Sequence, residues 1–144
     1  MRLLVDVRQR RGVRGSRFAW ANSQRLQALL AAERIAYAHH KQLAPTTELR
    51  QLQYREDDRM GVGKRSRGVL APDYVARYTQ EILDPVDLAP LVADFPRDGR
   101  PALFCVECSA AACHRSLVTA RLSREYGLRI INLKPPVDSA QTSP

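Results

Sequence analysis

All three cysteines of the chain lie in one short stretch, FCVECSAAACHRSLVTARL, which spans residues 104–122. A histidine and an arginine follow the third cysteine directly. Residues of these types support three kinds of chemistry: ligation of zinc, nucleophilic attack by a thiolate, and binding of an anion at the start of a helix. Each alternative makes a different demand on the spacing.

The zinc alternative has the right residue types. Four side chains of the zinc-binding kind occur here: Cys105, Cys108, Cys113 and His114. Cys105, however, falls inside an expected buried strand, and Cys113 and His114 are adjacent at a helix start, where neighbouring side chains point in different directions. We therefore expect no bound metal, no stoichiometric zinc and no other cofactor.

A thiolate nucleophile is the second alternative. In loops of the phosphatase or rhodanese type, a cysteine precedes an arginine by a fixed spacing around a bound oxyanion. Counted back from Arg115, that position holds Ser109, so the spacing misses a cysteine by one residue. Cys113 is still a candidate, because a helix start and nearby positive charge lower the pKa of a thiol. Otherwise Cys105 and Cys113 are small buried hydrophobic residues, and His114 is either a general acid or base or a helix cap.

The residues favour the third alternative, an anion site. A helix that begins near Cys113 presents unpaired backbone N–H groups, and Arg115 and Ser116 in its first turn add donors suited to phosphate. Positive charge is unfavourable at a helix N-terminus. Arg115 is therefore expected to have an anionic partner, either a ligand or an acid such as Glu107 or Asp6.

The elements that position these residues alternate between strand and helix. Apolar runs predict strands at residues 2–7, 35–40, 102–107 and 128–133. Helical spacing predicts helices at 23–34, 73–83, 87–93 and 114–126, and a weaker one at 43–52. Loops are expected at 8–17 and 54–68, the second possessing the charges and glycines of a partly ordered lid.

Strand, helix and strand within 102–133 form a βαβ unit, which requires parallel strands and predicts an α/β fold. We expect one domain over residues 1–133 and a disordered tail over 134–144, which is rich in Pro, Ser and Thr. Ligands bind beyond the carboxyl ends of parallel strands. Arg8 and Arg115 both follow such ends, so they are expected to line one pocket.

The overall charge also points to anionic partners. The 144 residues carry a net charge of +8, from 23 Lys and Arg against 15 Asp and Glu. No apolar run approaches the length needed to cross a bilayer, and the charged start MRLLVDVRQRR lacks the pattern of a signal peptide. Three clustered cysteines do not form a disulfide framework. We expect a cytoplasmic protein with reduced thiols and no membrane association.

Two blocks of the chain carry a family resemblance: LLVDVRQRRGVRGSRFAWANSQRLQALLAAERIAYAHHKQLA and LFCVECSAAACHRSLVTARL. They resemble the bacterial family known as domain of unknown function 488. Its pattern has a strand ending in Asp-Val-Arg, a later Ser-Arg, a Gly-Ile-x-Tyr segment leading to Leu-Gly, and a distant Leu-Cys-x-Glu strand before Cys-His-Arg-Ser. The matching residues are Asp6, Val7, Arg8, Ser16, Arg17, Ile35, Tyr37, Leu43, Cys105, Glu107, Cys113, His114, Arg115 and Ser116. The resemblance implies a Rossmann-like three-layer sandwich with a small, mostly parallel sheet.

The chain departs from the family pattern in three places. Members usually have a further strand and helix before the Asp-Val-Arg strand, so strand 2–7 is expected to lie at an exposed edge. The chain is then expected to form a homodimer through this region or to be less stable than a chain extended upstream. Arg34 and Ala44 replace glycines, so the following loop is expected to be shaped differently. Cys108 is not part of the pattern.

Two functions follow from these observations. In the first, the protein is an enzyme or ligand-binding domain for a phosphate-bearing substrate, such as a nucleotide or nucleic acid. Its catalytic residues are then Asp6, Glu107, Cys113 and His114, and its anion-binding residues are Arg8, Arg17, Arg115 and Ser116. In the second, it is a non-catalytic nucleic-acid-binding module in which the arginines of loop 8–17 neutralise backbone phosphates.

Overall fold

The computed structural model of the protein describes residues 1–63, 66–107 and 109–134. Three short strands form one sheet: β1 (Leu3–Asp6), β2 (Ala36–His39) and β3 (Pro101–Phe104). The strand order is β2-β1-β3 and both pairs are parallel, with Val5 opposite Ala38 on one side and Leu103 on the other. The predicted α/β class is confirmed.

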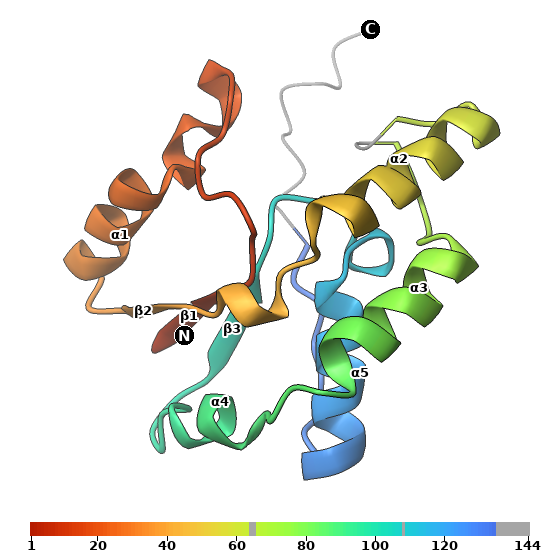
Figure 1. The fold of residues 1–144 in the computed structure, drawn as a ribbon. Helices are drawn as coiled ribbons and strands as arrows, with labels where there is room; N and C mark the ends of the chain where they lie inside the picture. The colour runs from red at the N-terminus through yellow and green to blue at the C-terminus, as the bar shows by residue number, and fades with distance from the viewer. Residues whose placement is uncertain (64–65, 108, 135–144) are drawn as a thin grey trace, which may run out of the picture.

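Helices cover both faces of this sheet, which gives three layers (Figure 1). On one face, α1 (Ser23–Ala32) packs Leu26 and Leu30 against Leu4. On the other face, Leu3 and Val5 join a larger core with residues of α2 (Thr47–Met60), α3 (Pro72–Tyr78) and α5 (Arg115–Tyr126). Successive side chains of a strand point to opposite faces, so β1 supplies both cores.

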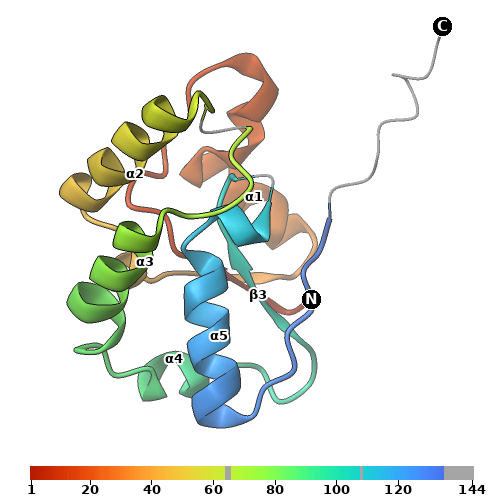
Figure 2. The same ribbon diagram turned by 90° about the vertical axis from the view of Figure 1, so that its right-hand side faces the viewer.

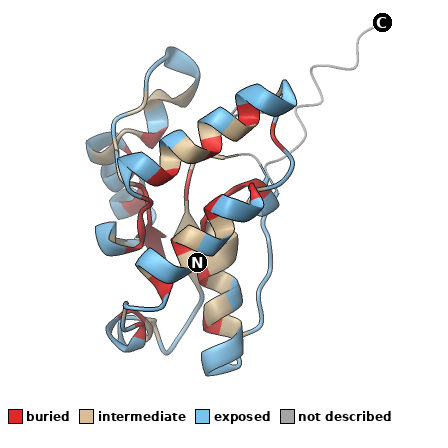
Figure 3. Ribbon diagram, turned by 45° about the vertical axis from the view of Figure 1, so that its right-hand side comes forward, coloured by how far each residue is buried: buried red, intermediate tan, exposed pale blue. Residues whose placement is uncertain are grey.

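Most of the predicted helices are confirmed, with small shifts of their ends. The helix α3 continues into a π-helical turn, Thr79–Leu83, and α4 (Ala89–Ala93) follows it. Loop 8–17 leads into a 3₁₀ helix, Ser16–Ala21. Buried residues lie along the inward faces of the helices (Figure 3).

The helix α2 is longer than its sequence pattern indicates. The side chain of Thr46 caps its start, and Gly61 ends it in the left-handed region with φ 68°. The loop predicted from residue 54 therefore begins only after Met60, and its residues 64–65 lie outside the described part. Gln53 and Asp57 occupy buried positions of the helix. A buried face made of polar residues has no apolar period, and for this reason the pattern missed it.

The strand predicted at 128–133 is wrong. From Leu128 to Lys134, where the described part ends, the chain forms no strand, and Ile130, Ile131 and Leu133 are exposed. Figure 2 shows this segment rising from the end of α5. Leu128 packs against the larger core, but the apolar residues that follow it are not buried, so burial does not stabilise a strand here.

The expectation that strand 2–7 lies at an exposed edge is also wrong. β1 is the central strand, and all four of its residues are buried. The edges of the sheet are β2 and β3 instead. The argument for a homodimer through β1 therefore loses its basis.

The two positions at which the chain lacks a family glycine behave differently. Arg34 adopts φ 57°, in the left-handed region that favours glycine. Ala44 has φ −73°, which any residue adopts. Only Arg34 therefore stands in a conformation that is costly for its residue type.

Among the described residues, no helix is both long and apolar enough to cross a membrane. The predicted tail at 134–144 lies outside the described residues apart from Lys134.

Candidate functional site

A pocket opens at the carboxyl ends of β1 and β3, where parallel sheets bind their ligands. Its volume is about 80 Å³. Its lining residues come from the loops after both strands, from α2 and α3, and from the segments before α3 and α5: Arg8, Gln9, Arg10, Pro45, Arg50, Gln53, Tyr54, Arg67, Leu70, Tyr74, Cys105, Val106, Glu107, Ala112, Cys113 and His114. Four arginines and one carboxylate are among them. Arg8 and Arg67 pair with buried aspartates, and the other two, Arg10 and Arg50, favour an anion.

Two cysteines, a histidine and a glutamate meet in one wall of this pocket. The Sγ atoms of Cys105 and Cys113 and one ring nitrogen of His114 lie within 4.8 Å of one another. Cys105 Sγ donates to Glu107 Oε2 at 2.6 Å, and Cys113 Sγ lies 3.5 Å from the same oxygen. The distance from Cys113 Sγ to His114 Nδ1 is 3.7 Å.

The expectation that Cys113 and His114 point apart is therefore wrong. It assumed that both residues belong to the helix. Cys113 instead has an extended backbone, with φ −133° and ψ 142°, and α5 begins only at Arg115. The geometric argument against a metal site does not hold for these two residues.

The imidazole of His114 is oriented by the end of β1. Its Nε2 lies 2.9 Å from the carbonyl oxygen of Val7. A carbonyl only accepts hydrogen bonds, so Nε2 carries the proton and, in the neutral ring, Nδ1 presents its lone pair toward Cys113. His114 occupies the N-cap position of α5, as the cap alternative expected, but its side chain makes no cap hydrogen bond and faces Val7 and Cys113 instead.

The two thiols differ in acidity because their neighbours differ. The hydrogen bond with Cys105 is the largest influence on Cys113; together with His114 it outweighs burial and lowers the pKa of Cys113 to about 6. The same bond, together with burial, raises the pKa of Cys105 well above its ordinary value. Burial lowers the pKa of His114, but its contacts with Cys113 outweigh burial and raise it. These neighbours therefore favour a Cys113 side chain in its thiolate form beside a Cys105 side chain in its protonated form.

Arg115 and Ser116 support this wall without lining the pocket. Arg115 donates from Nη1 to the carbonyl of Cys105 and from Nη2 to the carbonyl of Glu107, both at 2.9 Å. Ser116 Oγ donates to the carbonyl of Cys113 at 2.8 Å. The expected anionic partner of Arg115 is thus replaced by two backbone carbonyls, and both residues fix the loop that carries the cysteines.

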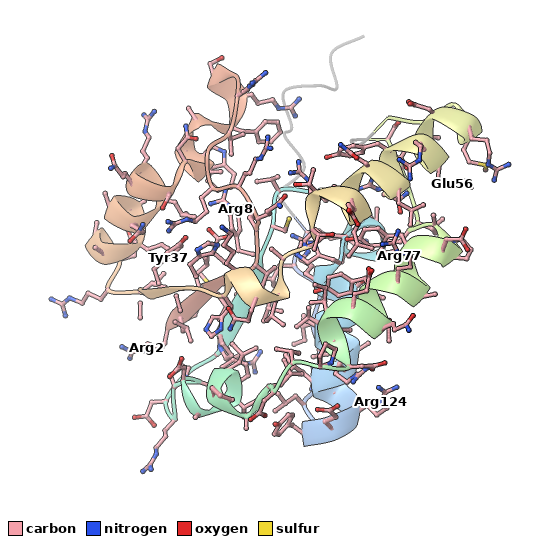
Figure 4. The ribbon with its side chains drawn as sticks, in the orientation of Figure 1. Arg2, Arg8, Tyr37, Glu56, Arg77 and Arg124 are labelled. Carbon is pink, nitrogen blue, oxygen red and sulfur yellow. The ribbon has the colours of Figure 1, made fainter. Side chains whose placement is uncertain are left out.

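Asp6 and Arg8 form a closed pair on the α1 side of the sheet. Arg8 donates to Asp6 from Nη2 at 2.8 Å and from Nε at 2.9 Å, and its Nη1 donates to the carbonyl of Ala21 at 2.7 Å. Tyr37 donates its hydroxyl to Asp6 at 2.7 Å, and the Arg8 guanidinium lies over the ring of Phe104. Figure 4 shows Arg8 and Tyr37 close to the loop that follows β1.

This arrangement corrects the predicted roles of Asp6 and Arg8. Asp6 is fully buried and does not line the pocket. The guanidinium groups of Arg8 and Arg115 both bond to protein acceptors instead of converging on one anion. Arg17, the remaining predicted anion-binding residue, is exposed over the ring of Phe18 and does not line the pocket either.

The pKa of Asp6 reflects this pairing. Burial is the largest single influence and raises the pKa, but the hydrogen bonds from Arg8 and Tyr37 outweigh it. The pKa of Asp6 therefore lies below its ordinary value of 3.8, and the carboxylate stays ionised inside the protein.

The sequence analysis missed a buried polar network that also borders the pocket. Arg67 donates from Nη1 to Asp57 at 2.6 Å and from Nε to the carbonyl of Ala112 at 3.2 Å. Gln53 donates to Asp57 at 2.8 Å and accepts from the backbone N–H of Ala71 at 2.9 Å. The spacing of Gln53 and Asp57, four residues apart, is the one signal that places them on the same helix face.

A parallel sheet with helices on both faces and a pocket beyond its carboxyl ends defines an α/β domain of the Rossmann-like class. The family model described as Domain of unknown function DUF488 matches residues 1–122. The chain belongs to this family. No curated protein and no solved structure matches it.

Proposed function

We propose that this protein is an enzyme that acts on a phosphate-bearing substrate, a nucleotide or the phosphate of a nucleic acid. Its reactive groups are Glu107, Cys113 and His114. The observation that carries the proposal is that these groups share one pocket with Arg10 and Arg50, two arginines outside the buried ion pairs of Arg8 and Arg67. A thiol and an imidazole 3.7 Å apart beside a carboxylate are groups that exchange protons with a substrate, and the arginines favour an anionic one.

The size of the pocket limits what part of the substrate enters. Sites for whole drug-sized ligands have volumes of roughly 300–1,000 Å³. The pocket here has about 80 Å³, which suits a small group such as a phosphate. The remainder of the substrate then lies outside, toward exposed residues such as Arg10.

Arg50 is the strongest candidate for contact with the phosphate. It is half-buried, and its guanidinium is oriented by Gln9, at 2.9 Å, and by the hydroxyl of Tyr54, at 3.2 Å. Neither partner is a carboxylate, so the charge of Arg50 is not neutralised by these bonds. Arg8 and Arg67, by contrast, each pair with a buried aspartate.

The test is a substrate screen with matched variants. The protein is incubated with nucleotides and with short single-stranded and duplex oligonucleotides, and products are followed by phosphorus NMR and mass spectrometry. We expect conversion of at least one class, lost in Glu107→Gln and His114→Gln. Arg50→Gln raises KM about tenfold, as the loss of a charged hydrogen bond predicts. Arg55→Gln, an exposed change on the same helix, leaves KM unaltered.

A second candidate function is a non-catalytic nucleic-acid-binding module. Arg10, Arg14 and Arg17 are exposed on one loop and its following 3₁₀ helix, as the contact of several phosphates requires. Binding of oligonucleotides without conversion of any substrate, and without an effect of Arg50→Gln, would favour this module over the enzyme.

A further inference from the structure

The wall of the pocket that carries Cys105, Cys113 and His114 has the geometry of a coordination sphere. We infer that these three side chains bind one zinc ion whose fourth coordination position faces the pocket. Metal binding itself requires no enzymatic activity, but the role of the ion rests on the proposed function.

The distances support one ion. In a tetrahedral zinc site, a sulfur at about 2.3 Å and a nitrogen or oxygen near 2.0–2.2 Å from the metal lie roughly 3.6 Å apart. Cys113 Sγ is 3.7 Å from His114 Nδ1. All three ligand atoms of Cys105, Cys113 and His114 lie within 4.8 Å of one another.

One contact must lengthen when the ion binds. Cys105 Sγ and Glu107 Oε2 are 2.6 Å apart, because the thiol donates its proton to the carboxylate. Cys105 binds zinc as a thiolate, so this proton is lost and the Sγ atom turns from the carboxylate toward the ion. Both residues lie in the short loop after β3, so a modest side-chain movement suffices.

Groups behind the ligands hold them in place, as in established metal sites. The carbonyl of Val7 accepts from His114 Nε2, which leaves Nδ1 as the ligand nitrogen. Arg115 fixes the carbonyls of Cys105 and Glu107, and Ser116 fixes that of Cys113. The site is therefore organised before the metal arrives.

The donor set selects the kind of metal. Two sulfurs and an imidazole suit zinc, whereas calcium and magnesium require oxygen ligands. Because all three ligand residues line the pocket, the open fourth position of the ion is in reach of a small anionic group bound there. A zinc ion in this position would polarise a phosphate oxygen or a bound water. Cys113 and His114 would then act as its ligands, and Glu107 would be the group left to exchange protons with the substrate.

The test measures metal directly and uses matched variants. Zinc per chain is determined by elemental analysis on the full-length protein, and the chelator-treated protein is titrated with cobalt(II), whose tetrahedral thiolate complexes absorb strongly in the visible and near ultraviolet. We expect one zinc per chain and such a spectrum. Cys113→Ser and His114→Gln weaken binding at least about 100-fold, beyond the 10–100-fold typical of changes behind the ligands.

The controls are the other residues of the same types. Cys108→Ser and His40→Gln are expected to keep one zinc per chain, and circular dichroism checks that each variant is folded. Absence of zinc together with absence of a cobalt–thiolate spectrum in the wild-type protein overturns the inference without needing any variant. Retention of zinc in folded Cys113→Ser, or its loss in Cys108→Ser, overturns the ligand set. A bound zinc without any substrate conversion leaves this inference standing and removes only the proposed function.

Discussion

At the scale of single residues, the most consequential pair is Asp6 with Arg8. Arg8 is only 4% exposed, and Asp6 is completely buried beneath it. A charge in such a place is tolerable only when a partner neutralises it and satisfies its donors. Arg8, which the sequence analysis predicts to bind an anion, therefore stabilises the fold by neutralising Asp6.

Asp6→Asn leaves the buried guanidinium of Arg8 without its counter-charge. Breaking a buried ion pair from one side costs about 3–5 kcal/mol, so we expect the free energy of unfolding to fall by that amount. Denaturant titration measures it. The matched control is Asp84→Asn, which removes one of two carboxylates that pair with Arg121, at an exposed position, and costs about 0–1 kcal/mol. Equal losses of unfolding free energy in both variants would show that the buried Asp6–Arg8 pair stabilises the protein no more than an exposed pair does.

The same carboxylate predicts a pH dependence. The pKa of Asp6 in the folded state lies below its ordinary value of 3.8, so its ionised form contributes stability above that pH and the contribution is lost as the pH falls through the folded pKa. The difference in unfolding free energy between wild type and Asp6→Asn is expected to be constant above about pH 5 and to shrink below about pH 4. Unfolding measured at a series of pH values checks this. A difference that grows on acidification would contradict the pairing.

Arg34 offers a second prediction at this scale. Its left-handed conformation, φ 57°, costs a non-glycine residue about 1–2 kcal/mol, which is partly offset by the greater chain entropy of glycine, about 0.5–1 kcal/mol. Arg34→Gly is expected to stabilise the protein by about 0.5–1 kcal/mol. Ala28→Gly, an exposed change inside α1, is the control and destabilises by about 1 kcal/mol. Thermal melts of both variants decide the sign.

At the scale of elements, sequence patterns succeeded where apolar residues face a core. The strand around Val5 and the helix around Leu26 and Leu30 follow from their spacing, because burial of these side chains is what stabilises them. The patterns failed where polar residues are buried, as with Gln53 in α2. They also failed at residues 128–133, which are rich in apolar side chains but do not pair with a strand of the sheet.

The candidate site was predictable in part for a similar reason. The carboxyl ends of parallel strands meet at one edge, so residues after β1 and β3 were placed correctly near one pocket. Which face each side chain takes was not predictable: Asp6 belongs to the α1 side and Cys105 to the other. The convergence of Cys113 with His114 depends on one extended residue before α5, which no spacing rule specifies.

Arg115 connects two elements, the start of α5 and the loop after β3. Arg115→Ala removes two hydrogen bonds from a charged donor, and such bonds are worth about 1.5–3 kcal/mol. We expect a loss of roughly that size in unfolding free energy and faster hydrogen exchange in residues 105–107. Arg124→Ala, an exposed change in the last turn of the same helix, is the control. An unchanged exchange rate in that loop would show that Arg115 does not hold it.

At the scale of the whole molecule, the net charge of +8 remains only partly explained by the site. The buried arginines Arg8 and Arg67 pair with aspartates inside the fold. The exposed arginines of loop 8–17 and its 3₁₀ helix have no such role, and Arg10 also borders the pocket. The molecule thus places an exposed cationic surface beside the opening of its candidate site.

This surface leads to the final prediction, on salt dependence. Each phosphate neutralised on duplex DNA contributes about −0.9 to the slope of log K against log salt. If Arg10, Arg14 and Arg17 contact phosphates, changing all three to glutamine reduces the slope by about 2.7, measured by fluorescence anisotropy at several salt concentrations. The control changes three exposed arginines elsewhere, Arg55, Arg97 and Arg124, to glutamine. Both variants lose the same charge, so a smaller slope in the first alone locates the nucleic acid at this loop, whereas equal slopes would assign binding to the net charge of the whole protein.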